Sequence, residues 1–261
     1  MCGRYVLTAD GSDLVEWFGV GTVDDDLPGP SYNITPSQRV VIVAETGSGR
    51  SLSTVEGPPD PPVRRLLGAR WGLVPPFAKS LTDGPTPFNA RSEKLMTSGL
   101  YRAPYARRRA IVPASGFYER RRTGDRQSYY IHPADGVLGL AGLYDWWRVP
   151  GLADDDPARW LLSATIVTRD AGGRMAPIHD REPLYLPPDL WADWLDPATP
   201  GGPELLAMAL DAGRTVADAL DFTPVGPGWL STRPGSYRDD PELLTPVPPV
   251  APTDDQMALP Q

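Results

Sequence analysis

The cysteine at position 2 offers the most distinctive chemistry in this sequence. Removal of Met1 leaves Cys2 as the first residue, with an amine and a thiol on adjacent carbons. Their ordinary pKa values, about 7.7–8.0 for the amine and about 8.5 for the thiol, leave each partly nucleophilic near neutral pH. The amine condenses with an aldehyde, and the thiol then closes on the imine to give a five-membered thiazolidine. Taken alone, Cys2 is a weak indication, because a free cysteine is usually a small buried side chain.

The cysteine and histidine content limits the other chemistry available. Cys2 is the only cysteine, and His132 and His179 are the only histidines. A disulfide scaffold, a thiolate zinc site and a histidine-rich metal centre are therefore excluded, and we expect neither a metal nor a cofactor. The chain has no signal-peptide apolar region and no apolar stretch near the length of a membrane span. We expect a cytoplasmic protein with no membrane partner.

The charge is unevenly distributed along the chain. The whole sequence carries 25 basic and 33 acidic residues, a net charge of −8. Residues 64–126 hold fourteen Arg and Lys against four Asp and Glu, a net +10, so the remainder carries −18. This asymmetry is typical of a protein that holds an anionic ligand on one face. It is equally compatible with solvated Arg-rich faces, so the charge alone does not choose between the two.

The elements that must position these residues are short. The patterns predict helices at residues 13–19, 92–99, 189–195, 204–210 and 215–220. They predict strands at residues 39–44, 110–113, 128–132, 137–141 and 161–168, with loops at 45–62 and 149–157. Short strands among short helices, with no βαβ rhythm, indicate an α+β class and a single domain. We place that domain at residues 1–247 and a flexible tail rich in Pro and Asp at 248–261.

Six motifs follow one another along the chain. They are MCGRY at the start, YNITPSQ (32–38), RWGLVPPF (70–77), FNARSEKL (88–95), RRAIVPASGFYER (108–120) and IVTRDAGGRMAPIHDREPLYL (166–186). In this order they resemble the SRAP family, the SOS response-associated peptidase-like proteins that shield abasic sites in single-stranded DNA during the DNA damage response. The resemblance runs from Cys2 to about Leu186 and resumes at residues 240–247, which look like the closing strand of the family. Six motifs in order are far more specific than any one of them.

The resemblance implies catalytic roles for four residues. Cys2, after loss of Met1, matches the residue that forms the thiazolidine with the ring-opened sugar. Asn89 and Arg91 match the pair that positions the N-terminus and holds the phosphate beside the lesion. Glu119 matches the active-site carboxylate, and His179 matches the histidine near the sugar. The catalytic set is then Cys2, Asn89, Glu119 and His179, with Arg91 binding DNA.

The resemblance also implies further DNA contacts and a fold. Arg4 of MCGRY would bind DNA, and Trp71, Pro75 and Phe77 would splay the strand. Arg120 stands where the family commonly carries a tryptophan, which puts one packing contact in doubt. The implied fold is a mainly antiparallel, barrel-like sheet of short strands with several short helices and a basic cleft for single-stranded DNA. We expect a monomer that is associated with the nucleoid when bound to DNA.

Physical chemistry assigns the steps. An abasic sugar is mostly a closed hemiacetal, and an imidazole can exchange protons at its ring oxygen, so His179 is expected to assist ring opening. A carboxylate within hydrogen-bond reach serves both amine deprotonation and loss of water from the carbinolamine, which is the role expected of Glu119. Arg91 suits a bidentate phosphate contact, and Asn89 can orient the terminal amine. We expect Arg122 to be peripheral.

Each residue also has a structural interpretation. Taken singly, a residue like His179 is more often a hydrogen-bonded loop histidine, one like Glu119 a surface ion-pair partner, and one like Trp71 a core residue. His132 is expected to be only a hydrogen-bonded residue at a strand end.

Two other functions stay open. One is a thiol peptidase, including autocatalytic removal of Met1, and the other is a DNA-binding module without covalent chemistry. A lyase activity through the imine is also undecided.

Overall fold

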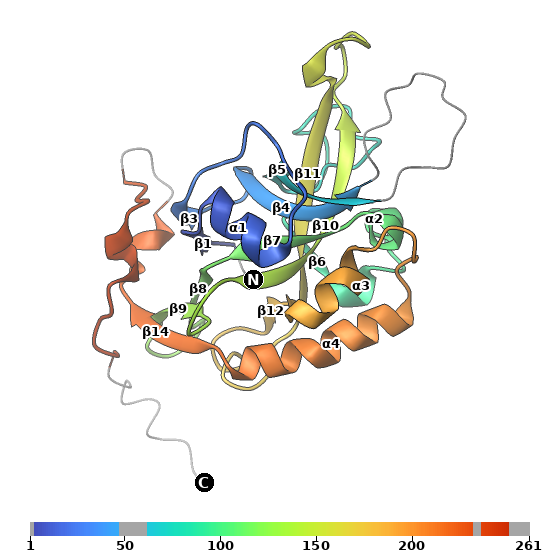
Figure 1. Ribbon diagram of the computed structural model, residues 1–261. Helices are drawn as coiled ribbons and strands as arrows, with labels where there is room; N and C mark the ends of the chain where they lie inside the picture. The colour runs from blue at the N-terminus through green and yellow to red at the C-terminus, as the bar shows by residue number, and fades with distance from the viewer. Residues whose placement is uncertain (1–2, 47–61, 232–235, 251–261) are drawn as a thin grey trace.

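The computed structural model describes residues 3–46, 62–231 and 236–250 of the chain. Its centre is a ring of five strands: β4 (Arg39–Thr46), β5 (Val63–Trp71), β7 (Arg109–Ala114), β10 (Leu138–Arg148) and β11 (Trp160–Asp170). Neighbouring strands of the ring pair antiparallel, except that β11 pairs parallel with β5 and so closes it into a barrel. Figure 1 shows this barrel with the smaller elements around it. The predicted single α+β domain with a barrel-like, mainly antiparallel sheet is confirmed.

A second sheet carries the amino-terminal strand. Its order is β14 (Asp221–Val225), β9 (Ser128–His132), β8 (Gly116–Arg120), β1 (Tyr5–Leu7) and β3 (Ser31–Ile34), and all neighbours in it are antiparallel. Four short strands extend the barrel sheet: β2 (Thr22–Val23), β6 (Asn89–Arg91), β12 (Arg181–Pro183) and β13 (Tyr185–Leu186).

Helices close the ends and edges of the two sheets. The α-helices are α1 (Gly11–Phe18), α2 (Arg102–Arg107), α3 (Trp191–Leu195) and α4 (Pro203–Asp218). The 3-10 turns are η1 (Ser92–Lys94), η2 (Pro157–Arg159), η3 (Pro188–Leu190), η4 (Pro227–Leu230) and η5 (Pro241–Leu244). Asp10 begins α1 by accepting from the N–H groups of Ser12 and Asp13, and Gly19 ends it in the left-handed conformation.

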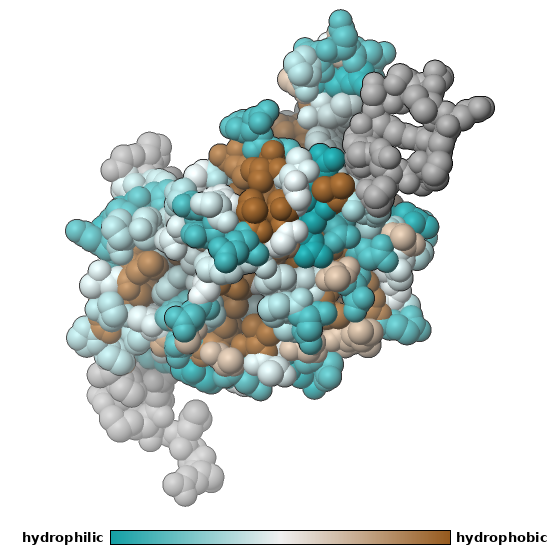
Figure 2. All heavy atoms as spheres, viewed as in Figure 1, coloured by the Kyte–Doolittle hydropathy of each residue, from teal (hydrophilic) through white to brown (hydrophobic). Residues whose placement is uncertain are grey.

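The antiparallel β10–β11 hairpin projects beyond the barrel. In Figure 1 it rises above the other strands, and Figure 2 shows that hydrophilic residues cover its tip. Its base is fixed by a small buried cluster in which Trp147 packs with Val74 and Ala78. The loop predicted at residues 149–157 forms the connection between the two strands of this hairpin and ends at the start of η2.

Several predicted elements differ from those observed. The predicted helix at residues 92–99 is only the 3-10 turn η1, and the two helices predicted at 204–210 and 215–220 are the single helix α4. The predicted closing strand at 240–247 is η5 followed by one bridge between Val225 and Pro246. Of the predicted tail, Val250 donates its N–H to Gln127, and residues 251–261 lie outside the described part of the chain, as does most of the predicted loop at 45–62.

Candidate active site

Glu119 lies on the strand that pairs with the amino-terminal strand. It is 8% exposed near the end of β8. In the pairing of β1 with β8, Tyr5 lies opposite Phe117, and the Tyr118 N–H donates to the carbonyl of Arg4 at 3.0 Å. The strand that follows Cys2 in sequence is therefore hydrogen-bonded to the strand that carries Glu119. Cys2 itself lies outside the described residues.

Burial dominates the electrostatics of Glu119. Desolvation of the carboxylate raises its pKa above the ordinary range, and the positive charge of Arg122 partly opposes this. A buried carboxyl group with a raised pKa holds its proton closer to neutral pH than an exposed one does. Glu119 is therefore suited to give a proton as well as to accept one.

Asn89 and Arg91 share one face of β6. This short strand runs parallel to β11, with Asn89 beside Ile166 and Arg91 beside Thr168. Ala90, between them, is fully buried. Because side chains alternate along a strand, Asn89 and Arg91 point away from that buried side, with Arg91 exposed and Asn89 half-buried.

His179 is held in the loop between β11 and β12. The residue is 3% exposed, and its backbone N–H donates to the carbonyl of Met175 at 3.0 Å. Its Nδ1 lies 2.9 Å from the backbone N–H of Arg181 and 2.8 Å from Oδ1 of Asp180. The first contact needs a lone pair on Nδ1 and the second needs a proton there, so the two contacts belong to different protonation states.

The protonation of His179 follows from its burial. Desolvation, with a further contribution from the charge of Arg122, lowers the pKa of His179 to about 4. The ring is therefore neutral near pH 7. We assign Nδ1 as the acceptor of the buried Arg181 N–H, which would otherwise lose its partner, and this places the ring proton on Nε2. His179 can therefore donate a hydrogen bond from Nε2, but it is not an imidazolium acid at neutral pH.

Arg181 joins the His179 loop to the Asn89 strand. Its guanidinium donates to both carboxylate oxygens of Glu93, at 2.6 and 2.9 Å, to the carbonyl of Thr168 at 2.7 Å and to Asp170. Glu93 lies in η1, directly after β6. Arg181 is 6% exposed, so these bonds fix the relative position of the two segments.

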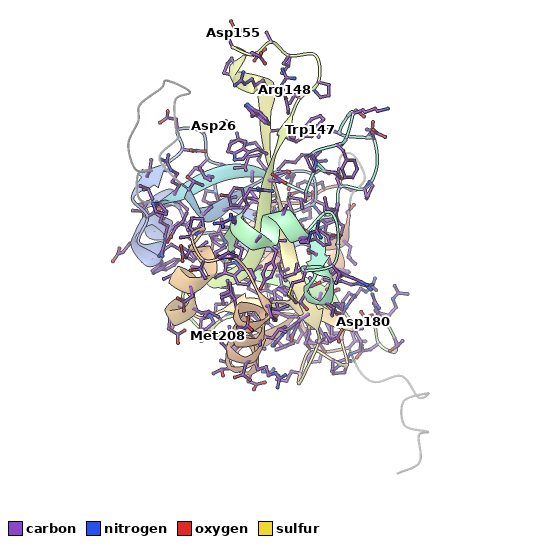
Figure 3. All side chains as sticks on the ribbon, turned by 90° about the vertical axis from the view of Figure 1, so that its right-hand side faces the viewer. Asp26, Trp147, Arg148, Asp155, Asp180 and Met208 are labelled. Atoms are coloured by element: carbon purple, nitrogen blue, oxygen red, sulfur yellow. The ribbon has the colours of Figure 1, made fainter. Side chains whose placement is uncertain are left out.

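Arg122 lies at the site, contrary to the expectation that it is peripheral. Its Nη1 is 3.0 Å from Oδ1 of Asp180, and both side chains are more than half exposed. Asp180 therefore stands between Arg122 and the ring of His179. In Figure 3 Asp180 lies far from Arg148 and Asp155 at the hairpin tip, so the site is at the end of the molecule away from that hairpin.

Three of the expected DNA-contacting side chains are buried. Trp71 is 1% exposed, donates its Nε1–H to the carbonyl of Phe88 and packs edge-on against Tyr5. Pro75 is buried, and Arg4 is 8% exposed. Phe77 is 77% exposed and is the member of this group that presents an open aromatic face.

Motif reasoning missed Glu93, Arg122, Asp180 and Arg181. Asp180 and Arg181 directly follow His179 in PIHDR, and Glu93 lies within FNARSEKL, so the motifs themselves contained the signal. Arg122 could be found only from the structure, because nothing in its Arg-rich surroundings distinguishes it. His132 fits its expected structural role, with its Nε2 3.0 Å from the Thr223 hydroxyl.

The described ranges, residues 3–46, 62–231 and 236–250, were also compared with the requirements of metal sites and membrane spans. Among them, no group of three or more His, Cys, Asp or Glu side chains is arranged to hold a metal ion. No helix within the same ranges is both long and apolar enough to span a membrane.

Comparison with known proteins identifies relatives over most of the chain. Residues 1–227 match the family model described as SOS response associated peptidase (SRAP). The abasic site processing protein YoqW of Bacillus subtilis is 32% identical over 204 residues, which cover 76% of this chain and 81% of that protein. The abasic site processing protein HMCES of Gallus gallus is 31% identical over 244 residues, which cover 84% of this chain and 66% of that protein.

Solved structures share the fold. A protein from Bacteroides thetaiotaomicron superposes with a TM-score of 0.71 at 20% identity and covers 94% of this chain and all of its own. A phage-related protein from Bordetella bronchiseptica gives a TM-score of 0.58 at 31% identity, covering 86% of this chain and 94% of that one. Because the Bacteroides thetaiotaomicron protein is only 20% identical to this chain, its similarity establishes the fold alone.

Proposed function

The chain belongs to the SRAP family, and we propose that it processes abasic sites by binding single-stranded DNA and linking itself covalently to the lesion. Cys2, exposed as the first residue by removal of Met1, is the proposed nucleophile. The family relationship and the names of its relatives support abasic-site processing. The covalent chemistry rests on the residue types of the site and on their placement.

The proposed reaction balances with the loss of one water molecule. The abasic sugar opens to its aldehyde, the Cys2 amine adds to C1, and the carbinolamine loses water to give an imine. The Cys2 thiol then adds across the C=N bond, its sulfur bonding to C1 and its proton going to nitrogen. The product is a thiazolidine, and no oxidant, metal or cofactor is needed.

Glu119 is the proposed acid and base. Because the β1–β8 pairing leads the chain toward Glu119, this carboxyl group is the described titratable group best placed for the amine. With a pKa raised by burial, it can accept a proton from the attacking amine and return it to the departing hydroxyl. Asn89 is proposed to orient the amine, since its amide offers both a donor and an acceptor.

His179 is proposed to assist ring opening as a neutral imidazole. With Nδ1 accepting from Arg181, the Nε2–H can donate to the sugar oxygen that carries negative charge as the ring opens. Arg91, exposed on the same strand as Asn89, is proposed to hold the neighbouring phosphate. Phe77 is proposed to stack on a base, and the other exposed arginines of residues 64–126 to follow the backbone without reading sequence.

The observation that carries the proposal is the pairing of β1 with the strand of buried Glu119. The test is intact-mass measurement after the protein is mixed with an abasic single strand. We expect a species whose mass is the Met1-free protein plus the DNA minus one water. An undamaged strand of the same sequence should give the protein mass alone. Absence of any covalent species with the abasic strand would contradict the proposal and leave a noncovalent DNA-binding module or a thiol peptidase.

A thiol peptidase is the other function that uses Cys2, and the family description contains that word. Acyl transfer needs the thiol but not a free α-amine, whereas thiazolidine formation needs both. A variant with a retained N-terminal extension before Cys2 should therefore lose DNA crosslinking and keep any peptidase activity. β-Elimination from the imine would appear in the same reactions as cleaved DNA. We propose a monomer, since one chain supplies every group named. We also propose that it acts on DNA in the cytoplasm.

A further inference from the structure

We propose that Arg4 is a positioning residue, locked by a C-terminal clasp, and that it does not contact DNA phosphate. The clasp is residues 227–231 and 236–244, which include η4 and η5. It fixes β1, the strand that leads to the reactive N-terminus, against β8. This inference rests on the proposed function. It assigns a supporting role to a part of the chain that lies far in sequence from Cys2, Asn89 and Glu119.

The guanidinium of Arg4 is buried and hydrogen-bonded inside the protein. One nitrogen, Nη1, donates to Oδ1 of Asn33 at 2.9 Å and to the carbonyl of Trp229 at 2.8 Å. Arg4 is 8% exposed and Asn33 is completely buried. If the side chain moved out to a phosphate, the buried Oδ1 of Asn33 would lose this donor, and a buried acceptor left without a partner costs free energy.

The clasp holds Asn33 and its strand from the other side. The Asn33 amide donates to the carbonyls of Arg238, at 2.7 Å, and Trp229, at 3.3 Å, and the Tyr237 hydroxyl donates to the Asn33 carbonyl. The Asp239 carboxylate accepts from the backbone N–H of Tyr32 and the hydroxyl of Ser31. Strand β3 therefore lies between β1 and the clasp and is bonded to both.

The clasp also contacts β8. Trp229 stacks on Tyr118 with ring centroids 5.2 Å apart and an angle of 10° between the planes. Tyr118 directly precedes Glu119, and its hydroxyl donates to the carbonyl of Tyr32 at 2.9 Å. In Figure 1 the C-terminal segment, in orange to red, runs beside β3 and β1. One segment thus aligns the two strands that meet at the site.

β1 needs such support because it is short. It has three residues, and its pairing with β3 is interrupted by a register shift between Tyr5 and Leu7. Few ladder bonds therefore hold it. Covalent chemistry is sensitive to placement, since a misplacement of about 1 Å can cost about 100-fold in rate. Most of the clasp lies beyond residue 227, where the family match ends, and its residues 240–244 fall within the stretch at 240–247 that resembles the end of the family's sequences.

The discriminating variant is Arg4→Lys. Lysine keeps the positive charge, but its ammonium nitrogen ends one bond short of the position from which Nη1 reaches both Asn33 and Trp229. We expect its maximal adduct rate at saturating abasic strand to fall about 10- to 100-fold, with unchanged affinity for an undamaged single strand. Arg4→Gln removes the charge and should also leave the salt slope of binding unchanged. A slope reduced by about 0.7, with weakened affinity, would identify Arg4 as a phosphate ligand and overturn the proposal.

Hydrogen exchange separates this proposal from the proposed function. In Arg4→Lys the amides of Tyr118 and Ser115, which donate to the carbonyls of Arg4 and Val6, should lose protection. This measurement needs no adduct, so unchanged protection overturns the positioning role even if the wild type never crosslinks.

The matched control is Arg64→Lys, because Arg64 likewise joins a side chain, Glu45, to a backbone carbonyl. It should lower thermal stability and leave the adduct rate unchanged; a comparable rate loss would mean that stability alone explains Arg4→Lys.

Discussion

Both carboxylate oxygens of Glu93 accept hydrogen bonds from the guanidinium of Arg181, at 2.6 and 2.9 Å. Glu93 follows the strand of Asn89 and Arg91, and Arg181 begins the strand that follows His179. This bidentate pair therefore joins the two segments that carry the proposed site. It lowers the pKa of Glu93 to about 2, because the hydrogen bonds from Arg181 favour the ionised carboxylate.

Glu93→Gln should lower the stability of the protein in a pH-dependent way. The folded pKa of about 2 lies below the ordinary carboxyl value of about 4.3. The stabilisation is present above that ordinary value and is lost as the pH falls through the folded pKa. Urea unfolding of wild type and variant should differ most near neutral pH and converge on acidification. A difference that does not change with pH would mean that the pair contributes nothing through its charge.

His179→Ala should slow adduct formation on an abasic deoxyribose more than on an open aldehyde carried on the same strand. Ring opening is needed only in the first case. The effect should be about 10²- to 10³-fold if the Nε2–H stabilises the opening ring. Single-turnover rates on both substrates measure it. Equal slowing of the two would place His179 after ring opening.

The pH profile supplies a second check on His179. Its pKa of about 4 means that the ring stays neutral as the pH rises from about 5 to 8. The wild-type rate should therefore show no inflection near the ordinary histidine value of about 6.5, and any rise should follow deprotonation of the amine. An inflection near pH 6.5 that disappears in His179→Ala would contradict the assigned protonation.

Glu119→Gln should slow adduct formation with both the abasic deoxyribose and the open aldehyde. The stability of the variant relative to wild type should also increase as the pH rises. The first effect follows because glutamine keeps size and hydrogen bonding without exchanging a proton. The second follows because burial raises the folded pKa of Glu119, so wild type loses stability as the pH rises through it, whereas glutamine does not titrate. Unfolding titrations across pH give the comparison. A stability difference that falls with pH would show that the ionised form is the one stabilised.

DNA binding should weaken steeply with salt despite the net charge of −8. Each phosphate neutralised contributes about −0.7 to the slope of log K against log salt for a single strand. Arg91→Glu should weaken binding, and Arg122→Glu should also do so, because Arg122 lies beside Asp180 at the site. Charge reversal at Arg148, on the distant hairpin, is the control and should have little effect. A flat salt dependence would remove the basic segment from the interface.

Strands rich in β-branched apolar residues are predictable from the sequence, whereas strands that also contain charged residues are not. Residues 39–44 and 128–132 form strands because apolar side chains fill the barrel or the second sheet. β5 was missed since its sequence, VRRLLGARW, contains charges; Arg64 is accommodated by Glu45 on the neighbouring strand. The break predicted in α4 is also wrong. Gly213 marks close packing there, since a Cβ would lie 2.7 Å from the carbonyl of Tyr185.

The candidate site was predictable by residue type, but its burial was not. Motifs identify Asn89, Glu119 and His179, while the pKa values of Glu119 and His179 depend on strands brought together from distant parts of the chain. The same limit explains Trp71 and Arg4. A motif records that a tryptophan and an arginine are required and does not record whether they face solvent or the interior. Their roles become visible only when Phe88, Asn33 and Trp229 are placed around them.

Both nucleophiles of Cys2 are proposed to bond to one sugar carbon. The direct measurement is NMR of the adduct formed between protein labelled with ¹⁵N at cysteine and a single strand labelled with ¹³C at C1 of the abasic site. Cys2 is the only cysteine, so the ¹⁵N signal is unambiguous. We predict one sp³ carbon with a direct ¹³C–¹⁵N coupling and a chemical shift typical of a carbon bonded to nitrogen and sulfur. An sp² imine carbon, or a carbon without coupling to the Cys2 nitrogen, would contradict it.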